Sequence, residues 1–554
     1  MYNDKSAGYK RGVYLALFTV MLMMISIVKC GVTYTMDASD DNFFSKFLVG
    51  EISGRPDSNI PFINFLLAKI LKCAYLFTNR IHWYPDLHLC ILFFSLFEVV
   101  SLLMDKAFIK DKVSLCINTL MILSIYNLVY FWNICSLSFT ITPIIGYLGV
   151  ALLLYRKRKA LSLNDSVLII IISALSMMLR DRSGIIGLAF CILIYIGTQK
   201  KVNKFFVIWI LTSSSIIFSQ MIWEKIGPLS SYFEFQKACA AYFDWGGITF
   251  YDNPDLFLKN GINEELYLLF RNWILFEPQL SLSFIKSITY DNSGILSTSN
   301  GLLEGVNLLA QFLISEPIVA LLFFLYLFFF VQMIRKPLLN VYNLRKLVPS
   351  LMGLAGTFYL CLLGRINNRS VYVCMFIPLV LSLCQYALNR KNEHKKVIAV
   401  ILLFCISLFF IKNEYDTGWI KKSERQKQYQ EMIELANSNP DNVYLYYPDL
   451  VLASDPYLSN TKVKNASNLV MISSSYFGLP AFNKQLRING IDEYSASVLL
   501  DDNVYMLVGH EDNMTCLYNY LYTKVGDDLF VEEVHYPKID SIYVYKFSEG
   551  IGEQ

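Results

Sequence analysis

The sequence has few charged residues, few histidines and no regular repeat. Only 17% of its 554 residues are charged, whereas 55% are hydrophobic, and this balance lies outside that of soluble globular proteins. The five histidines do not cluster, and the twelve cysteines form neither a disulfide framework nor a zinc-ligand pattern. The net charge of +3 is divided among many short clusters, which argues against a nucleic-acid-binding patch. We therefore interpret the chain as a polytopic α-helical membrane protein.

Long apolar runs recur along the chain and define its predicted spans. A helix needs roughly 20 apolar residues to cross a bilayer, and eleven segments approach that length. They are residues 13–29, 87–104, 113–132, 140–155, 165–179, 184–198, 205–222, 308–333, 347–363, 370–388 and 397–411. The first follows basic residues and precedes no small-residue cleavage site, so we expect it to be retained as a signal anchor.

Basic clusters at alternate junctions predict the orientation. Six of them fall on the same side by parity, and the positive-inside rule makes that side cytoplasmic. They are Lys5/Lys10/Arg11, Lys106/Lys110/Lys112, the run 156–159, Lys200/Lys201/Lys204, Arg335/Lys336/Arg345/Lys346 and Arg390/Lys391/Lys395/Lys396. The prediction is therefore an N-terminus inside and a C-terminus outside.

The same parity predicts which segments face outward. Two long outer loops are expected at about residues 30–86 and 223–306, and the first contains an apolar stretch, 61–77, with two lysines that suits a helix lying in the membrane interface. Residues 412–554 have a mixed composition with short β-rich runs such as "NVYLYYP". We predict two parts: a transmembrane module, 1–411, and a small extracytoplasmic α/β domain, 412–554.

Two tight outer turns carry arginine against the positive-inside trend. "MMLRDRSGI" contains Arg180, Asp181 and Arg182, and "LGRINNRSVY" contains Arg365 and Arg369. Each arginine taken alone fits a solvated loop charge or an interfacial side chain. Arginine is also the residue best suited to bidentate phosphate recognition. Taken together, the two turns favour an outward-facing site for an anionic ligand.

An acidic pair, Asp40 and Asp41, follows the first apolar segment in "MDASDD". It could be an ordinary solvated pair at the start of a loop. Alternatively, one carboxylate acts as a general base while the other orients substrate, binds a divalent ion or shifts the pKa of the first. Adjacent side chains point in different directions, so we expect one to act and the other to support it.

The second outer loop, 223–306, is rich in aromatic residues. These residues could be the core of a compact loop domain on the membrane surface. Sugars, however, are bound by aromatic faces together with carboxylate and amide groups, and Asp244, Trp245, Glu264 and Trp273 offer such groups. We include these four as candidate substrate-binding residues.

The arrangement resembles the GT-C superfamily of integral-membrane glycosyltransferases, which use polyprenyl-phosphate-linked sugars, and within it the bacterial proteins that glucosylate O-antigen and other surface polymers. The resemblance rests on the cytoplasmic N-terminus, the "DD" pair opening a long first outer loop, the expected interfacial helix in that loop, the long second loop, "GRINNR" (364–369) and the outer C-terminal domain. It covers most of residues 1–411.

The resemblance implies a reaction and a set of roles. An acceptor hydroxyl would attack the anomeric carbon of a lipid-phosphate sugar with inversion, and Asp40 or Asp41 would take the proton. The arginines of the two outer turns would hold the phosphate: Arg180, Arg182, Arg365 and Arg369. No cofactor is implied with certainty, and a divalent cation, Mg²⁺ or Mn²⁺, is left open. The expected partners are the lipid-linked donor, a glycan or lipid-linked acceptor and the bilayer of a bacterial plasma membrane.

Two other functions compete with this one. A polysaccharide polymerase or ligase also has many spans and outer arginines, but such proteins tend not to carry an acid pair in the first loop. A flippase or transporter of lipid-linked oligosaccharides would need ionisable groups in mid-membrane and discontinuous helices. The predicted spans are mostly apolar at their centres, with Glu98 the clearest exception.

Overall fold

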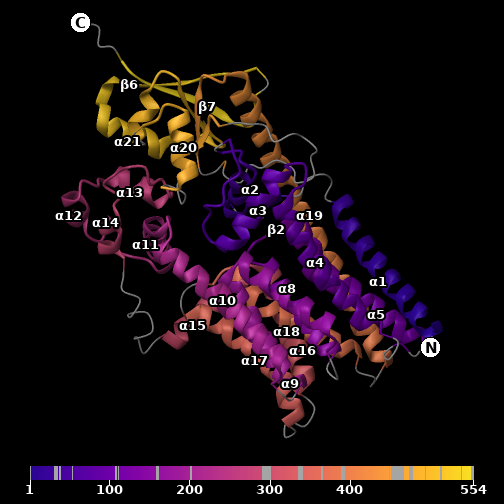
Figure 1. Cartoon of the computed structure of the whole chain (residues 1–554). Coiled ribbons are helices and arrows are strands. Elements are labelled where there is room, and N and C mark those ends of the chain that lie inside the picture. The colour runs from indigo at the N-terminus through magenta and orange to yellow at the C-terminus, as the bar shows by residue number, and fades with distance from the viewer. Residues whose placement is uncertain are drawn as a thin grey trace.

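A computed structural model of the whole chain shows a helical bundle below an assembly of loop helices and a small sheet domain (Figure 1). The structure describes every part of the chain except a set of short segments. These are residues 1, 30–34, 37–38, 53, 106–108, 110, 158–160, 200–201, 290–300, 335–340, 363–365, 389–392, 448–449, 451–466, 473–477, 493–494, 512–513, 538 and 551–554.

Every predicted span lies on helix. The bundle consists of α1 (Tyr2–Lys29), α4 (Trp83–Leu103), α5 (Lys112–Ile125), the π-helix η1 (Tyr126–Tyr130), α6 (Phe131–Cys135), α7 (Thr142–Arg156), α8 (Leu163–Leu179), α9 (Asp181–Gln199), α10 (Lys204–Ile226), α16 (Pro317–Ile334), α17 (Val341–Leu362), α18 (Asn368–Leu388) and α19 (Glu393–Ser438). Among the described residues, five helices are long and apolar enough to cross a membrane, or six with a bent pair, and five shorter apolar helices accompany them. The count of eleven spans and their orientation remain predictions.

One predicted span, 308–333, is not a single straight helix. Helix α15 (Gly301–Ser315) ends at Glu316, and α16 begins at Pro317 with its axis turned by 116°. Proline lacks a backbone N–H and is favoured in the first turn of a helix, so it starts α16 and cannot continue α15. The 18 residues of α16 extend about 27 Å at 1.5 Å per residue, which nearly spans a bilayer by itself.

Helix α7 is at the centre of the bundle, and its residues from Thr142 to Leu154 are buried. It packs on α4, α8, α9 and α18. Glycine makes the closest approach possible: a Cβ added at Gly149 would lie 2.7 Å from the ring of Phe94 and 2.8 Å from the Cα of Ser95 on α4. Small residues at such crossings let membrane helices pack backbone to backbone.

The ionisable Glu98 of α4 is paired inside the bundle. Arg156, at the end of α7, donates from Nη2 to Glu98 Oε1 at 2.9 Å and from Nε to Oε2 at 3.1 Å. Both residues lie toward the end of the bundle that the sequence predicts to be cytoplasmic. Glu98 is therefore a partner in a helix-to-helix ion pair, which accounts for its burial.

The outer loops fold into short helices. The first loop contains α2 (Ser39–Val49) and α3 (Phe65–Phe77), the second contains α11 (Ser230–Trp245), α12 (Pro254–Lys259), α13 (Glu264–Arg271) and α14 (Leu282–Ile288). Helix α3 exposes a face of large apolar residues, among them Ile70 and Phe77, beside the exposed Lys69. Such a face suits the interfacial position that the sequence predicts.

The C-terminal part is an α/β unit, as predicted. Its sheet has the order β4-β3-β5-β7-β6, in which β3 pairs in parallel with β4 and β5, and β7 pairs antiparallel with β5 and β6. The strands are β3 (Val443–Tyr446), β4 (Leu469–Met471), β5 (Val504–Val508), β6 (Leu529–Glu533) and β7 (Tyr543–Glu549), and helices α20 (Pro480–Ile488) and α21 (Met514–Val525) accompany them. Helix α19 runs without interruption across residue 411, where the sequence predicts the domain boundary.

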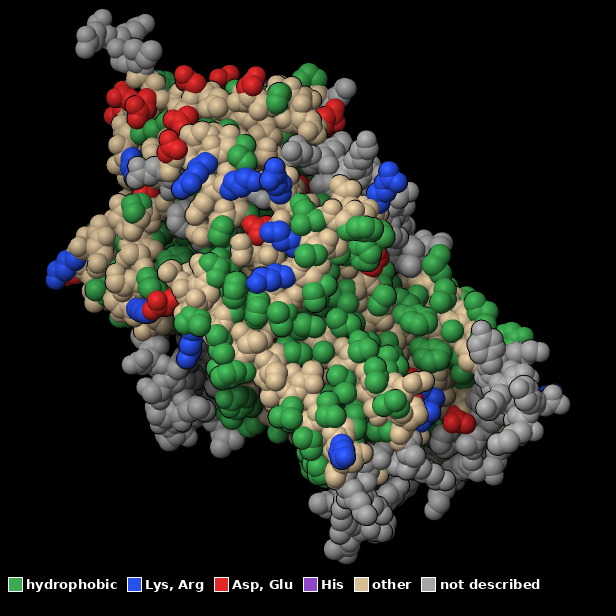
Figure 2. Space-filling view, in the orientation of Figure 1, with side chains coloured by type: hydrophobic (Ala, Val, Ile, Leu, Met, Phe, Trp, Pro, Cys, Tyr) green, Lys and Arg blue, Asp and Glu red, His purple; other side chains and the backbone are tan. Residues whose placement is uncertain are grey.

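A single hydrophobic core joins the outer parts. It includes Phe44 of α2, Leu67 of α3, Tyr242 of α11 and Val470 of β4, and a second core fills the bundle. Figure 2 shows hydrophobic side chains covering the bundle, acidic side chains on the C-terminal unit, and lysine and arginine between them. This distribution of side chains is expected when the bundle lies in a membrane and the loop helices and the sheet lie in water.

One cysteine forms a disulfide bond, although the sequence shows no disulfide framework. Cys135, at the end of α6, is disulfide-bonded, whereas ten other cysteines are free. Cysteine is a common buried residue in apolar runs, so its spacing gave no signal for this bond. Disulfides persist in oxidising compartments, which agrees with the predicted outer position of this end of α6.

We predict that Gly149→Ala destabilises the protein, because the new Cβ must displace the Phe94 ring and the α4 backbone. Overpacking of this kind costs about 1–3 kcal/mol. The free energy of unfolding, measured by denaturant titration in detergent, checks it. The matched control is Gly12→Ala in α1, where an added Cβ meets nothing within 4 Å; equal stability of the two variants would contradict the packing argument.

Candidate active site

The acidic pair occupies the first turn of α2, just after a short strand. That strand, β1 (Thr35–Met36), pairs in parallel with β2 (Ser136–Leu137), which follows α6. The pairing fixes the chain directly before α2 against the connection between α6 and α7. Carboxylates are favourable in the first turn of a helix, where the backbone dipole presents its positive end. The pair is therefore part of a helix and not of an extended loop.

Asp41 is fully buried, with 0% of its side chain exposed. Its Oδ1 accepts hydrogen bonds from the hydroxyl of Tyr84, at 3.0 Å, and from the backbone N–H of Phe139, at 2.9 Å. These donors come from the start of α4 and from the segment after β2. The Asp41 carboxylate thus joins three segments, and its burial keeps it away from any ligand in solvent.

Arg180 caps α8, and its guanidinium lies close to two aromatic rings. Its guanidinium carbon lies 4.6 Å from the ring centroid of Phe139 and 4.9 Å from that of Phe62. The two rings stack on each other with centroids 6.5 Å apart. The first outer loop is tied to the same place, because the Asn64 N–H donates to the Met178 carbonyl at 2.8 Å. Stacking holds a guanidinium by its faces and leaves the N–H groups at its edge for an anion.

Arg180 and the acidic pair belong to one electrostatic cluster. Burial lowers the pKa of the Arg180 guanidinium, and the carboxylates of Asp181, Asp40 and Asp41 oppose that shift. Asp40 also acts on α11: burial raises the pKa of the Tyr232 phenol, and the Asp40 charge raises it further. Asp40 itself is half-exposed. Of the two acids, Asp40 is therefore the one that a ligand beside Arg180 could reach.

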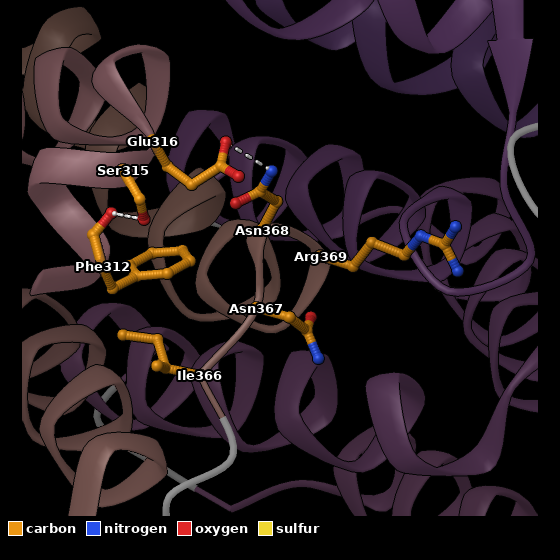
Figure 3. A pocket seen from close by; sticks show the side chains of 7 residues that line it. All are labelled: Phe312, Ser315, Glu316, Ile366, Asn367, Asn368 and Arg369. Atoms are coloured by element: carbon orange, nitrogen blue, oxygen red, sulfur yellow. Dashed lines mark hydrogen bonds between the residues drawn. The ribbon is translucent and has the colours of Figure 1, made fainter. Parts of the chain in front are cut away.

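The second predicted arginine turn lies elsewhere. Arg365 lies outside the described residues. Arg369 lines a cavity of about 500 Å³ with Phe312, Ser315, Glu316, Ile366, Asn367 and Asn368, and none of these residues belongs to the Arg180 cluster. Figure 3 shows the Arg369 side chain extending away from Glu316 and Asn368. Arg182 is exposed in the first turn of α9, next to the half-exposed Asp181.

The aromatic residues of the second loop mainly build its own core. Trp273 is half-buried with its ring stacked on Phe243 at 4.0 Å, and Glu264 accepts a hydrogen bond from the Tyr251 hydroxyl at 2.8 Å. The side chains of Asp244 and Trp245 lie outside the described ones, although their backbone ends α11. The packing of Trp273 fits the alternative of a compact loop domain. None of the contacts named above joins the candidate substrate-binding residues of this loop to Asp40.

Several residues of the site carry no motif in the sequence. Phe139, Phe62 and Tyr84 were not singled out because aromatic residues are abundant throughout the chain. His88 is another: it is fully buried, and its Nδ1 lies 2.8 Å from the Thr142 hydroxyl. Phe62 has a φ of +67°, which is rare for a residue with a side chain, and this tight turn is visible only in the structure.

No metal centre is evident in the part of the chain that the structure describes. Among those residues, no group of three or more His, Cys, Asp or Glu side chains is placed to hold an ion. Asp41 uses Oδ1 for two protein donors, and it is buried where Asp40 is half-exposed.

Comparison with known proteins gave little. No protein-family model matches the chain, and no curated protein matches it. Two crystal structures of ArnT from Cupriavidus metallidurans are similar along nearly the whole length. The chain aligns with the undecaprenyl-phosphate-bound form at a TM-score of 0.37 and 10% identity, covering 96% of this chain and 97% of that one. The apo form gives a TM-score of 0.38, 10% identity and coverages of 97% and 98%. TM-scores this low carry no argument, so the function is argued from the residues.

We predict that Tyr84→Phe lowers the free energy of unfolding by about 1.5–3 kcal/mol, the usual worth of a hydrogen bond to a charged group. The variant leaves Asp41 buried with the Phe139 N–H and without the Tyr84 hydroxyl. Denaturant titration in detergent measures the change. Tyr14→Phe, at a position that is 69% exposed on α1, is the control; a loss of the same size there would show that the Tyr84 hydrogen bond has no particular role.

Proposed function

We propose that the chain is a membrane glycosyltransferase that moves a sugar from a polyprenyl-phosphate donor to an acceptor hydroxyl on the extracytoplasmic face. The observation that carries the proposal is the position of Phe139. Its backbone N–H holds the buried Asp41, and its ring contacts the Arg180 guanidinium. Such a transfer requires a general base and a cation that binds the phosphate. Phe139 contacts both Asp41, which adjoins the proposed base, and Arg180, the proposed cation.

The two aspartates have different roles in this proposal. Asp41 is the positioning residue, since both of its known donors are protein groups and it is inaccessible. Asp40 is the general base, because it is half-exposed and lies within electrostatic range of Arg180 and Tyr232. A carboxylate that substrate can reach is a suitable acceptor for the hydroxyl proton.

The chemistry is a single displacement. The acceptor oxygen forms a bond to the anomeric carbon as its proton passes to the Asp40 carboxylate. The bond between that carbon and the phosphate oxygen breaks, and its electron pair leaves with the polyprenyl phosphate. Arg180 stabilises the charge that develops on this leaving group. Attack from the side opposite the phosphate inverts the configuration, and a hexose is the expected sugar.

The surroundings support access from the bilayer. The groups of the proposed site come from the outer ends of α4, α8 and α9 and from the loops joined to them, in the predicted orientation. The helices below expose large apolar side chains, such as Leu211 and Phe218 of α10. A lipid tail can lie against these helices while its phosphate reaches Arg180. The plasma membrane of a bacterium and an envelope glycan as acceptor remain part of the proposal.

A second candidate function is favoured by one observation. The break between α15 and α16 is a discontinuous helix, a feature that many secondary transporters have at their binding sites. Against this function, the ion pair with Arg156 accounts for Glu98, the clearest charge within a span. A fluorescent lipid-linked oligosaccharide in proteoliposomes separates the two: transfer of the sugar to an acceptor supports the enzyme, and translocation without transfer supports the flippase.

We predict that Asp40→Asn lowers the rate constant of sugar transfer by about 10²–10⁴-fold, the range that a general base contributes. Donor affinity should stay close to that of the wild type, because Arg180, which binds the phosphate, is unchanged. Transfer from a polyprenyl-phosphate sugar in nanodiscs measures the rate. Asp255→Asn, an exposed acid of α12, is the control. Transfer at the wild-type rate in Asp40→Asn would refute the role of this base.

We predict that Arg180→Gln weakens binding of undecaprenyl phosphate by about 10–100-fold, since a charged hydrogen bond is worth about 1.5–3 kcal/mol. Arg180→Lys should recover only part of the affinity, because an ammonium group has neither the planar face for stacking on Phe62 and Phe139 nor the forked N–H edge. The dissociation constant for undecaprenyl phosphate, measured in detergent, is compared with that of the control Arg487→Gln, an exposed position on α20. Unchanged affinity in Arg180→Gln would remove this residue from the phosphate site.

A further inference from the structure

The elbow between α15 and α16 contains a polar cavity that the proposed reaction does not use. It has a volume of about 500 Å³ and is lined by side chains from the elbow and from the start of α18. This volume lies within the range of small-molecule sites. The lining residues are distinct from Asp40, Asp41 and Arg180, so the cavity is a separate feature of the outer end of the bundle.

The polar groups of the cavity are held in place by one another. Asn368 donates from Nδ2 to Glu316 Oε2 at 2.9 Å, which fixes both side chains, and Figure 3 shows them pointing toward each other. The oxygen of the Asn368 amide, Oδ1, is buried and has no hydrogen-bond partner within the described part of the chain. A buried acceptor that the protein leaves unmet is a place where a bound hydroxyl or water is expected.

The neighbouring residues add a donor and an apolar face. Asn367 Oδ1 accepts from the N–H and the hydroxyl of Ser370, both at 2.9 Å, as the cap of α18. The amide group that Asn367 can still offer is therefore its NH₂. Phe312 lines the same cavity with an aromatic ring. The lining thus combines a carboxylate, two amides, one hydroxyl, one guanidinium and one aromatic ring.

This combination has a characteristic ligand. A carboxylate accepts hydrogen bonds from hydroxyl groups, amides donate and accept, and an aromatic face covers the C–H side of a sugar ring. Arg369 also lines the cavity, but its side chain extends away from Glu316 and Asn368 (Figure 3). A phosphate hydrogen-bonded to Asn368 would therefore lie beside the Glu316 carboxylate, which would repel it. A purely apolar ligand would leave the acceptors unmet. The chemistry therefore points to a neutral, hydroxyl-rich ring.

We propose that the cavity formed by Phe312, Glu316, Asn367 and Asn368 is a saccharide subsite that binds one pyranose ring of a substrate. The inference rests on the proposed function for the identity of that substrate, but the binding itself needs no catalysis. The ring belongs either to the sugar of the donor or to the acceptor glycan, and the two sources present the same hydroxyl groups to Glu316 and Asn368.

Saturation-transfer NMR on the full-length protein in nanodiscs tests the binding. The probes are the methyl glycosides of glucose, galactose, mannose, rhamnose, N-acetylglucosamine and N-acetylgalactosamine, each presented separately. At least one should receive saturation from the wild-type protein. Its affinity should fall about tenfold or more in Glu316→Gln, where a charged acceptor of the hydroxyl hydrogen bonds is lost. Gln311→Ala, an exposed site on α15 outside the cavity, is the matched control and should bind as the wild type does.

Two further variants keep the outcome decisive. Ile366→Trp fills the cavity without removing a polar group, and it should abolish binding while the thermal unfolding midpoint stays near that of the wild type. Asp40→Asn should bind the glycoside normally, because its defect is confined to the transfer step. If no glycoside binds the wild type, or if Glu316→Gln and Ile366→Trp both bind it as tightly as the wild type does, the subsite is refuted. Normal binding without any transfer activity in the wild type would instead refute the proposed function.

Donor and acceptor are distinguished by kinetics. When the ring is that of the acceptor, Glu316→Gln raises the KM for acceptor and leaves the KM for the polyprenyl-phosphate sugar unchanged; when it is that of the donor, the opposite holds. Either result supports the subsite. Wild-type values of kcat and of both KM values in Glu316→Gln and in Ile366→Trp would overturn it.

Discussion

The outer end of this protein depends on one buried carboxylate. Asp41 is completely enclosed, and an enclosed charge is stable only when hydrogen bonds replace the water it has lost. The Tyr84 hydroxyl and the Phe139 N–H provide such bonds. Through them α2, α4 and the segment after β2 are held in one arrangement. That arrangement fixes the Phe139 ring, and the ring in turn supports the Arg180 guanidinium.

The parts above the membrane strengthen this arrangement because they share one hydrophobic core. Glu277, buried in the second loop, accepts from the Lys524 ammonium at 3.0 Å and from the Ala496 N–H at 3.0 Å in the C-terminal unit. On the other side, the Tyr429 hydroxyl of α19 donates to Glu51 at 2.5 Å, close to the end of α2. The C-terminal unit therefore holds both loops in place, which gives it a structural role beside Asp40, Asp41 and Arg180.

The break at Glu316 has consequences for both the membrane and the chemistry. Because α15 turns away by 116°, α16 alone provides the apolar length at this point, and the polar residues of the elbow remain at the end of the bundle that is predicted to face outward. A straight helix would have placed Glu316 inside the bilayer, where an ionised carboxylate is costly. The same turn opens the cavity next to α18, so one proline-directed bend serves the topology and the proposed subsite together.

The sequence by itself determined the helices, because apolar runs and basic flanks reflect the cost of placing charge in lipid, and that cost acts locally along the chain. The helices of the bundle, helix α3 in the first loop and the α/β character of the C-terminal part could be predicted on this basis, whereas helices α2 and α11 to α14 lie in segments that were expected to be loops. Arg180 as a phosphate ligand stays a prediction. Only the tertiary structure decided which residues contact one another. Asp40 and Asp41 are adjacent in sequence, and burial against Tyr84 and Phe139, which lie 43 and 98 residues away from Asp41, is what separates their roles. Contacts across such distances leave no periodic trace in the chain, because they depend on how the helices pack.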